Sequence, residues 1–312
     1  MLRRSLLALA RSERVKRLAS TMPVSGGIVS RFVAGETPED AVRVSSELAA
    51  DGMRVSLDHL GEDTLDRAQA DAKVAEYVEV LRQLGEAGLT TDTEVSVKLS
   101  AIGQAMPGDR EDANRVALEN ARRVCQAARN AGTTVTLDAE DHTTTDATLD
   151  VLTELRQDFP ETGAVLQAYL RRTEGDCKDL AHTGSRVRLC KGAYNEPESV
   201  AYPDRIDVDR SYVRCLKVLM NGAGYPMIAT HDPRLIRIGG VLADRADRAQ
   251  DSYEYQMLYG VRPEEQRRLV GAGNTMRVYV PYGDEWYGYL MRRLAERPAN
   301  VGFFVRSVAT KG

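Results

Sequence analysis

The stretch RVSLDHLGEDTLDRAQADAKVAEYVEVLRQLGEAGLTTDTEVSVKLSAIG (54–103) is predicted to contain a strand, a helix and the next strand. Its β-rich runs, 54–61 and 94–103, alternate polar and apolar residues, as strands do. Between them the apolar spacing changes to about 3.6, which predicts a helix, and Gly88 can take the left-handed conformation that ends it. The stripe expected to face the core consists of Leu65, Ala68, Ala72, Ala75, Val78 and Leu81.

The same unit recurs along the chain. Further strands are predicted at 134–141, 164–172, 186–194, 226–232, 252–260 and 276–283, and Gly132, Gly224 and Gly273 are expected to cap helices as Gly88 does. Eight βα units in about 240 residues, without a Pro/Gly/Ser-rich linker, favour a closed (β/α)8 barrel over an open doubly wound sheet. We therefore predict an α/β TIM-like barrel over 51–312 and an N-terminal helical extension over 1–50.

The composition is that of an ordinary globular protein. The 312 residues are 43% hydrophobic and 28% charged, which argues against disorder and against a membrane bundle. The net charge of -4 gives no basic excess for binding nucleic acid. The four cysteines form no C-x-x-C pair and the four histidines no H-E-x-x-H motif, so we expect reduced thiols in a cytoplasmic protein and no metal site.

The N-terminal segment is the most basic part of the chain. Residues 1–20 carry six basic residues against Glu13 alone, a local charge of +5. Their apolar run, 6–10, is too short for a signal-peptide core or a membrane span. Two interpretations stay open: a helix packed on the body, or a basic amphipathic helix that touches anionic lipid at the inner face of the cell membrane.

Polar residues stand at the ends of the predicted strands, where barrels carry their active sites. Taken singly, each could be a structural ion pair, but as a set they form a cationic mouth that suits a phosphate or a carboxylate. After Arg188, the turn Gly192–Ala193 presents bare backbone amides that a phosphate or a flavin ring could approach closely. No Rossmann or P-loop glycine motif occurs. The strand-end residues are Lys98, Asp138, Glu140, Gln167, Arg188, Lys191, His231 and Tyr279.

The last predicted helix lies in GDEWYGYLMRRLAERP (283–298). Tyr289, Arg292, Arg293 and Glu296 fall at i, i+3, i+4 and i+7 and therefore share one face. Adjacent arginines are ordinarily a solvated surface pair. Directly after the last strand they would also clamp a carboxylate, and this helix would then lie over the barrel mouth.

Seven strings resemble, in order, those of the proline dehydrogenases: SVKLSAIG, TLDAEDH, VLQAYLRR, RLCKGAY, ATHD, YEYQMLYG and YLMRRLAERPAN. The resemblance implies a distorted (βα)8 barrel that binds FAD non-covalently and oxidises L-proline to 1-pyrroline-5-carboxylate, the first step of proline catabolism. It also implies a membrane quinone as the electron acceptor. Neither a DNA-binding segment nor an aldehyde dehydrogenase half is matched, which implies the monofunctional bacterial form.

The resemblance also implies roles for individual residues. Lys98, Asp138 and Arg188 would be catalytic, with Lys98 on the substrate side and Asp138 near the flavin ring. The remaining flavin-binding positions would be Gln167, Lys191, Gly192, Ala193, Tyr194, Thr230 and His231, together with Asp138 and Arg188. The proline pocket would consist of Tyr279, Tyr289, Arg292, Arg293 and Glu296, together with Lys98.

The chemistry of the residues agrees with these roles. Hydride transfer from proline C5 to flavin N5 requires a fixed substrate carboxylate, and a cation such as Arg188 near the flavin would favour its anionic reduced form. Two alternatives stay open. Lys98 or Lys191 could be a Schiff-base lysine of an aldolase, because desolvation between cations lowers a lysine pKa. The barrel could also bind proline or a protein partner without catalysis.

Overall fold

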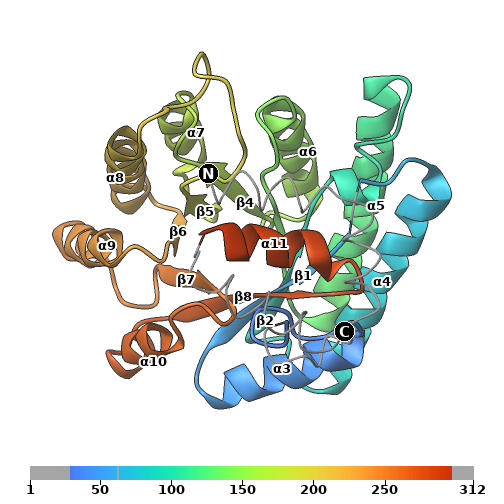
Figure 1. Cartoon of the computed structure of the whole chain (residues 1–312), viewed down its shortest axis with the longest axis horizontal. Helices are drawn as coiled ribbons and strands as arrows, with labels where there is room; N and C mark the ends of the chain where they lie inside the picture. Colours follow the sequence, from blue (N-terminus) through green and yellow to red (C-terminus); the bar gives the residue numbers. More distant parts are fainter. Residues whose placement is uncertain (1–28, 62, 297–312) are drawn as a thin grey trace, which may run out of the picture.

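The chain forms one closed barrel of eight parallel strands joined in sequence order (Figure 1). The structure, a computed structural model, describes residues 29–61 and 63–296. The barrel closes where β1 pairs with β8, from Arg54 opposite Arg277 to His59 opposite Tyr282. The strands are β1 (Arg54–His59), β2 (Thr93–Val97), β3 (Val135–Leu137), β4 (Gly163–Gln167), β5 (Arg186–Cys190), β6 (Tyr225–Ala229), β7 (Glu254–Leu258) and β8 (Met276–Tyr282). All eight predicted strands are therefore confirmed.

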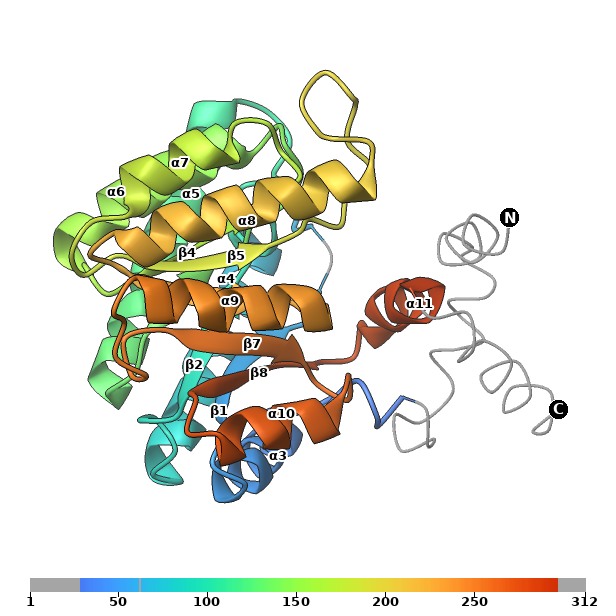
Figure 2. The same cartoon turned by 90° about the vertical axis from the view of Figure 1, so that its left-hand side faces the viewer.

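Helices surround the barrel, and one helix lies across its end. A short 3-10 helix, η1 (Ser100–Ile102), follows β2. The outer helices are α3 (Pro38–Ala50), α4 (Arg67–Glu86), α5 (Arg110–Ala131), α6 (Thr145–Asp158), α7 (Thr173–Leu180), α8 (Arg205–Asn221), α9 (Pro233–Arg245) and α10 (Pro263–Gly271). The last helix, α11 (Trp286–Glu296), crosses the middle of the ring of helices in Figure 1, and in Figure 2 it lies beyond the carboxyl ends of β7 and β8. This position confirms the predicted helix over the barrel mouth.

The hydrophobic core lies between the strands and the outer helices. Val55 and Leu57 of β1 and Val95 and Val97 of β2 are completely buried in a core cluster that includes the inner faces of the helices. Because strand side chains alternate, the neighbouring positions point into the barrel, and many of these are polar. The alternation thus separates an apolar layer outside the sheet from a polar interior.

The predicted stripe of the first long helix is wrong. Leu65 is 61% exposed and Val78 is 40% exposed, and of the predicted set only Leu81 is buried. Tyr77, which the apolar spacing omitted, is 1% exposed and donates its hydroxyl to the Ser96 carbonyl at 3.0 Å. The larger side chains set the buried face, which consists of Ala70, Val74, Tyr77, Val80, Leu81 and Leu84.

The predicted glycine caps are confirmed at three of four positions, and the prediction for Gly224 is wrong. Gly88, Gly132 and Gly273 have positive φ angles of 68°, 85° and 80°. Gly224 does not, because α8 ends earlier, at Asn221. A Cβ on Gly224 would lie 2.6 Å from the Ser185 carbonyl oxygen, so the glycine is needed for close backbone approach before β6.

The segment before β1 packs on the barrel. Ala41 and Val44 of α3 belong to the main core cluster. Thr37 caps α3: its hydroxyl accepts from the Asp40 amide at 3.3 Å, and the Asp40 carboxylate accepts from the Thr37 amide at 3.4 Å. The predicted division of the chain at residue 50 stays a prediction, and residues 1–20 lie outside the described residues.

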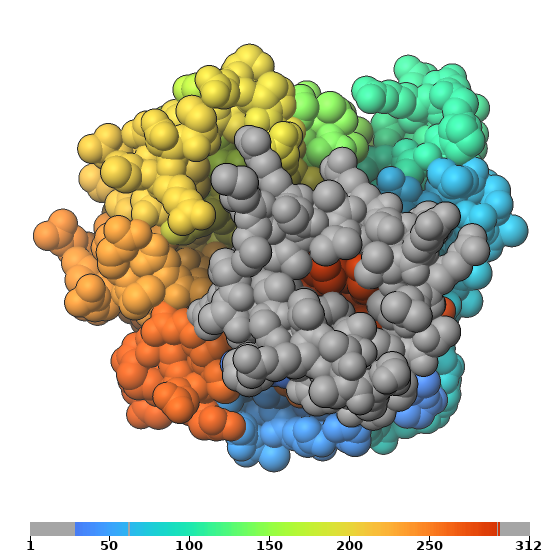
Figure 3. All heavy atoms as spheres, viewed as in Figure 1, coloured from blue at the N-terminus to red at the C-terminus, as the bar shows by residue number. Residues whose placement is uncertain are grey.

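A second apolar cluster holds α11 in place. Trp286, Tyr287, Leu290 and Met291 pack with a group from the start of the described chain and the end of β1: Val29, Phe32, Val33 and Leu60. Figure 3 shows the molecule from the same side as Figure 1, and atoms of α11 are visible near the centre, inside the ring of outer helices. Across residues 29–61 and 63–296 no helix combines the length and the apolarity needed to span a bilayer.

Candidate active site

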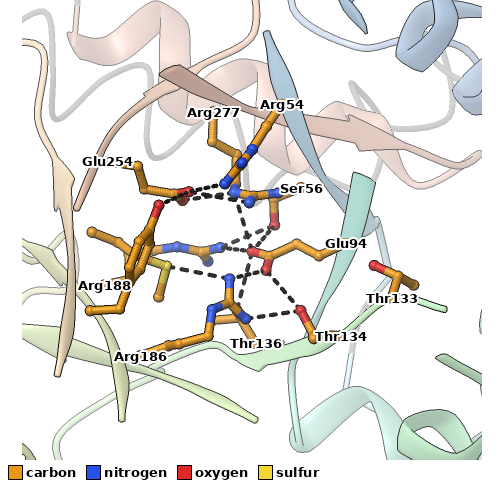
Figure 4. Close-up of polar contacts among 12 residues, drawn as sticks. Arg54, Ser56, Glu94, Thr133, Thr134, Thr136, Arg186, Arg188, Glu254 and Arg277 are labelled. Carbon is orange, nitrogen blue, oxygen red and sulfur yellow. Dashed lines mark hydrogen bonds and ion pairs between the residues drawn. The ribbon is translucent and has the colours of Figure 1, made fainter. Parts of the chain in front are cut away.

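Charged side chains fill the barrel interior (Figure 4). TIM barrels usually fill this space with branched aliphatic residues. Here Glu94 of β2 and Glu254 of β7, which are at most 1% exposed, meet a set of arginines inside the sheet. These arginines are Arg186 and Arg188 of β5 and Arg277 of β8. Arg54 of β1, whose side chain is 40% exposed, lies at the edge of the network, 4.0 Å from Glu254.

Glu94 is the anionic centre of this network. Its Oε2 accepts from Arg186 at 2.5 Å, and its Oε1 accepts from Arg188 at 3.2 Å. Hydroxyls of Ser56 and Thr136 also donate to Oε1, at 3.1 and 3.2 Å. Burial alone would raise the pKa of Glu94, but the nearby arginines outweigh it and hold the pKa well below its usual range. Glu94 is therefore a carboxylate at any working pH.

Arg188 links the network to the barrel mouth. Its side chain is 4% exposed, and its guanidinium carbon lies 5.3 Å from the centre of the Tyr279 ring. Each of its five N–H groups has a protein acceptor within 3.2 Å. These acceptors are Gln256 for Nε, Ser96 and Asp138 for Nη1, and Ser56 and Glu94 for Nη2.

Asp138 and Tyr279 form the next layer toward the mouth. Asp138 Oδ1 accepts from Ser96 and from Arg188, each at 2.8 Å, and the Tyr279 hydroxyl donates to Oδ2 at 2.6 Å. Burial, followed by the charge of Asp138, raises the pKa of Tyr279 well above its usual value. Tyr279 is therefore a neutral hydrogen-bond donor, and the predicted residues Asp138, Arg188 and Tyr279 do form one cluster.

Lys98 follows β2 and forms an ion pair with Asp58 near the end of β1. Burial would lower the pKa of Lys98, but Asp58 and Asp138 outweigh it and raise the pKa. A Schiff-base lysine must be neutral to attack a carbonyl. Because Lys98 lies between acids rather than between cations, the aldolase interpretation loses its physical basis at this position.

Gln167, at the end of β4, carries a buried polar atom without a partner. The side chain is 4% exposed, and its Oε1 accepts no hydrogen bond from any described residue. Thr148 Oγ1, also without a described partner, lines the same cavity of about 20 Å³. Nearby, Glu140 accepts from the Ser100 amide at 3.1 Å and from its hydroxyl at 2.5 Å, so Glu140 is occupied by the loop after β2.

The turn after β5 contacts α8 and the residue that precedes α9. Lys191 pairs with Asp209 at 2.6 Å and Asp232 at 3.2 Å, while Ala193 and Tyr194 are exposed. Gly192 has a φ of 107°, and a Cβ there would lie 2.2 Å from the Tyr169 ring. The glycine is therefore required by the chain itself, and the approach of a phosphate stays a prediction.

Two further predicted residues lie after β6. Thr230 is buried, and its hydroxyl accepts from the Asp232 amide at 3.1 Å. The Leu258 amide donates to Nε2 of His231 at 2.9 Å, so this ring nitrogen carries no proton. In the described parts of the chain, no three His, Cys, Asp or Glu side chains are grouped to hold a metal ion.

On α11, Tyr289 is buried and the Arg293 guanidinium lies 5.2 Å from the centre of its ring. These two residues do share a face, as the spacing predicted. The side chains of Arg292 and Glu296 lie outside the described residues, so the predicted carboxylate clamp stays a prediction.

Sequence reasoning missed the residues that support the cluster, among them Asp58, Glu94 and Ser96. Each occupies an inward position on β1 or β2 and bonds to a residue that was predicted. Their alternation with buried Val and Leu was a usable signal. Polar residues at such positions usually face solvent, however, and only closure of the barrel turns them toward Lys98 and Arg188.

The comparisons agree on one family. The model of the proline dehydrogenase family matches residues 41–306. A proline dehydrogenase of Deinococcus radiodurans is 38% identical over 310 residues, covering 98% of this chain and 97% of its own. Proline dehydrogenase 2 of Bacillus subtilis is 37% identical over 282 residues, 90% of each chain.

A solved structure agrees with these relatives. The crystal structure of proline utilization A (PutA) from Bdellovibrio bacteriovorus inactivated by N-propargylglycine matches with a TM-score of 0.77 at 25% identity, over 93% of this chain and 38% of that one. Family model, relatives and fold coincide over nearly the whole barrel, and this chain belongs to the proline dehydrogenase family.

Proposed function

We propose that this chain catalyses the FAD-dependent oxidation of L-proline to 1-pyrroline-5-carboxylate, the first step of proline catabolism, and passes the electrons to a membrane quinone. The observation that carries the proposal is the buried cluster of Asp138, Arg188 and Tyr279, beside the Lys98–Asp58 pair at the mouth of a proline dehydrogenase barrel.

The residues present fit a flavin. A flavin ring offers hydrogen-bond donors and acceptors, and Gln167 has a buried amide oxygen without a partner among the described residues. Arg188 and Lys191 are cations that suit the reduced ring and the phosphates. When bound, FAD supplies the acceptor for a hydride from proline C5. The residues that would hold it are Asp138, Gln167, Arg188, Lys191, Gly192, Ala193, Tyr194, Thr230 and His231.

The substrate would lie between the cluster and α11. Arg292 and Arg293 would bind its carboxylate, with Tyr289 and Glu296 orienting the two guanidiniums. Tyr279 would pack against the proline ring, and Lys98, held as a cation by Asp58, would complete the polar side of the pocket. The protein would thus fix the ring so that hydride leaves C5 and a proton leaves the nitrogen as the C5–N double bond forms.

The electron acceptor and the location of the protein complete the proposal. The quinone lies in the membrane, so a cytoplasmic protein must reach its surface. Residues 1–20, with their local charge of +5, would make a peripheral contact with anionic lipid at the inner face of the cell membrane.

The visible spectrum of the purified protein tests the proposal. We expect a flavin spectrum that anaerobic L-proline bleaches. A colourless protein that borohydride links to its substrate would instead support a Schiff-base enzyme, and a colourless protein inert to both would leave a binding barrel. Arg188→Met should lower the flavin midpoint potential and slow its reduction, and an unchanged potential would contradict the placement of Arg188.

A further inference from the structure

We infer that Glu94 is a positioning residue, which holds the Arg188 guanidinium in the orientation that serves the flavin. The inference rests on the proposed function, since Arg188 is there the cation beside the cofactor. Glu94 itself lies deeper in the barrel, one inward position before Ser96 on β2. It would therefore act through Arg188 and not on the substrate.

The contact spans the barrel. Strands β2 and β5 are not neighbours in the sheet, so Glu94 and Arg188 meet across its interior. Arg186 and Arg188 both point inward from β5 and would repel one another. Glu94 places one carboxylate oxygen against each, at 2.5 Å from Arg186 and 3.2 Å from Arg188, and so lies between the two cations (Figure 4).

The carboxylate is itself fixed. Ser56 and Thr136 donate to the oxygen that Arg188 contacts, and Ser56 Oγ also accepts from Arg188 at 3.0 Å. Glu94 is 1% exposed and Arg188 is 4% exposed, so bulk water does not reach their contact. Loss of the carboxylate contact would free the deep edge of the guanidinium to shift toward Asp138 or away from Arg186.

Glu94→Asp is the sharpest test, because it keeps the charge and shortens the side chain by one methylene. We expect the shorter aspartate to lose at least one of the two arginine contacts, which are 2.5 and 3.2 Å long in Glu94. If Glu94 acted only through its charge, the flavin midpoint potential would stay unchanged. A positioning role predicts a fall in potential, in the direction of Arg188→Met, and about tenfold slower anaerobic reduction by proline, with FAD content retained.

Glu254→Asp is the matched control. Glu254 is equally buried in the same barrel, but its contacts to Arg188 are indirect. One runs through Gln256, and the other runs through Arg277, which pairs with Glu254 at 2.7 Å and lies 3.9 Å from Glu94. Because these contacts are indirect, the flavin midpoint potential and the reduction rate should change less in Glu254→Asp than in Glu94→Asp. Equal values for Glu94→Asp and Glu254→Asp would overturn the inference.

The outcome separates the inference from the proposed function. An unchanged potential in Arg188→Met counts against the flavin placement, whereas a fall in Arg188→Met without one in Glu94→Asp counts against Glu94 alone. If Glu94→Asp does not fold, the double variant Glu94→Gln/Arg186→Met restores the charge balance. Its potential must then lie below that of Arg186→Met, and an equal or higher value overturns the inference.

Discussion

Arg188 shows why an arginine, and not a lysine, occupies this position. Its planar guanidinium has five N–H groups, and the acceptors come from β1, β2, β7 and the residue directly after β3. A lysine has only three donors on one nitrogen and could serve only part of this set. One face lies against Tyr279, so a ligand that contacts Arg188 must use the other face or replace one of the five acceptors.

Arg293 tests the substrate clamp at the level of one side chain. A charge-assisted hydrogen bond contributes roughly 1.5 to 3 kcal/mol, so Arg293→Met should lower kcat/KM for proline about ten- to a hundredfold while FAD stays bound. Arg293→Lys should recover only part of the lost kcat/KM, because a lysine ammonium cannot make the two parallel hydrogen bonds that a guanidinium makes to a carboxylate. Steady-state kinetics with flavin content measured alongside decides the point.

The control for Arg293 is Arg267→Met. The Arg267 side chain is 62% exposed, and its Nε lies 3.6 Å from an Asp51 carboxylate oxygen, so the two form an exposed ion pair. An exposed pair contributes about 0 to 1 kcal/mol, and its kinetics should be near normal. If Arg293→Met behaves like Arg267→Met, the solvated-pair interpretation of the last helix is correct.

His59 gives a pH dependence whose sign is fixed by its surroundings. Burial, and then the charges of Lys73 and Lys98, hold the pKa of His59 down to about 3. The unfolded chain binds a proton there below about pH 6.5, but the native chain does not until about pH 3. The free energy of unfolding therefore falls as the pH decreases through this window, by up to about 1.4 kcal/mol per pH unit from this group.

Denaturant unfolding at pH 7, 6 and 5 measures this slope. We expect a shallower loss of stability in His59→Asn than in the parent protein. His182→Asn, which removes an exposed histidine, should keep the parental slope. If the free energy of unfolding falls with pH equally in the parent protein, His59→Asn and His182→Asn, His59 is not the source of the slope.

At the scale of elements, α11 is attached by its own apolar cluster, apart from the barrel core. Trp286 is 2% exposed, and its Nε1 donates to Glu36 at 3.3 Å. Removing a buried tryptophan side chain costs about 3 to 5 kcal/mol, which here should loosen α11 and leave the barrel folded.

The prediction for Trp286→Ala is a KM for proline raised at least about tenfold, a retained flavin spectrum and a nearly unchanged Tm of the barrel. Trp286→Phe, which keeps most of the packing, should stay close to the parent protein. A large loss of barrel stability in Trp286→Ala would show that α11 and the barrel unfold as one unit.

The elements also show what the sequence could predict. All eight strands were found, because β-rich runs between glycine-ended helices carry a strong local signal. The buried face of α4 was not, because an apolar count included the small Ala68 and left out Tyr77, and only the contact with Ser96 of β2 selects the tyrosine. Local periodicity therefore predicts that a helix is present more reliably than it predicts which face of the helix is buried.

For the site, the residues at strand ends were predicted and the supporting residues were not. Asp138 and Tyr279 were expected at the mouth, and they bond directly. Glu94 was missed, because its role depends on Arg188, 94 positions later in the chain, and on a closed sheet that brings them together. Contacts across a barrel leave no local pattern.

For the whole molecule, the charge distribution makes a prediction about the membrane. Residues 1–20 carry a local charge of +5 in a chain whose net charge is -4. We expect anionic liposomes to bind the full chain and to release it as salt rises, because the screening length shortens to about 8 Å at physiological ionic strength. Cosedimentation of the full chain and of a chain lacking residues 1–20 measures the difference, and equal binding by both would contradict the prediction.

The charged barrel interior has a consequence for how the protein responds to heat. Exposing apolar surface raises the heat capacity of unfolding, whereas exposing polar surface lowers it. This barrel releases arginines, glutamates and hydroxyls from its centre where others release aliphatic side chains. Calorimetry should therefore give a heat-capacity increment below the usual value of roughly 12 to 15 cal/mol/K per residue, and a correspondingly flat dependence of stability on temperature. Because the desolvation penalty of ion pairs falls on warming, the same interior should lose less of its stabilising effect near the upper limit of growth temperature than an aliphatic one.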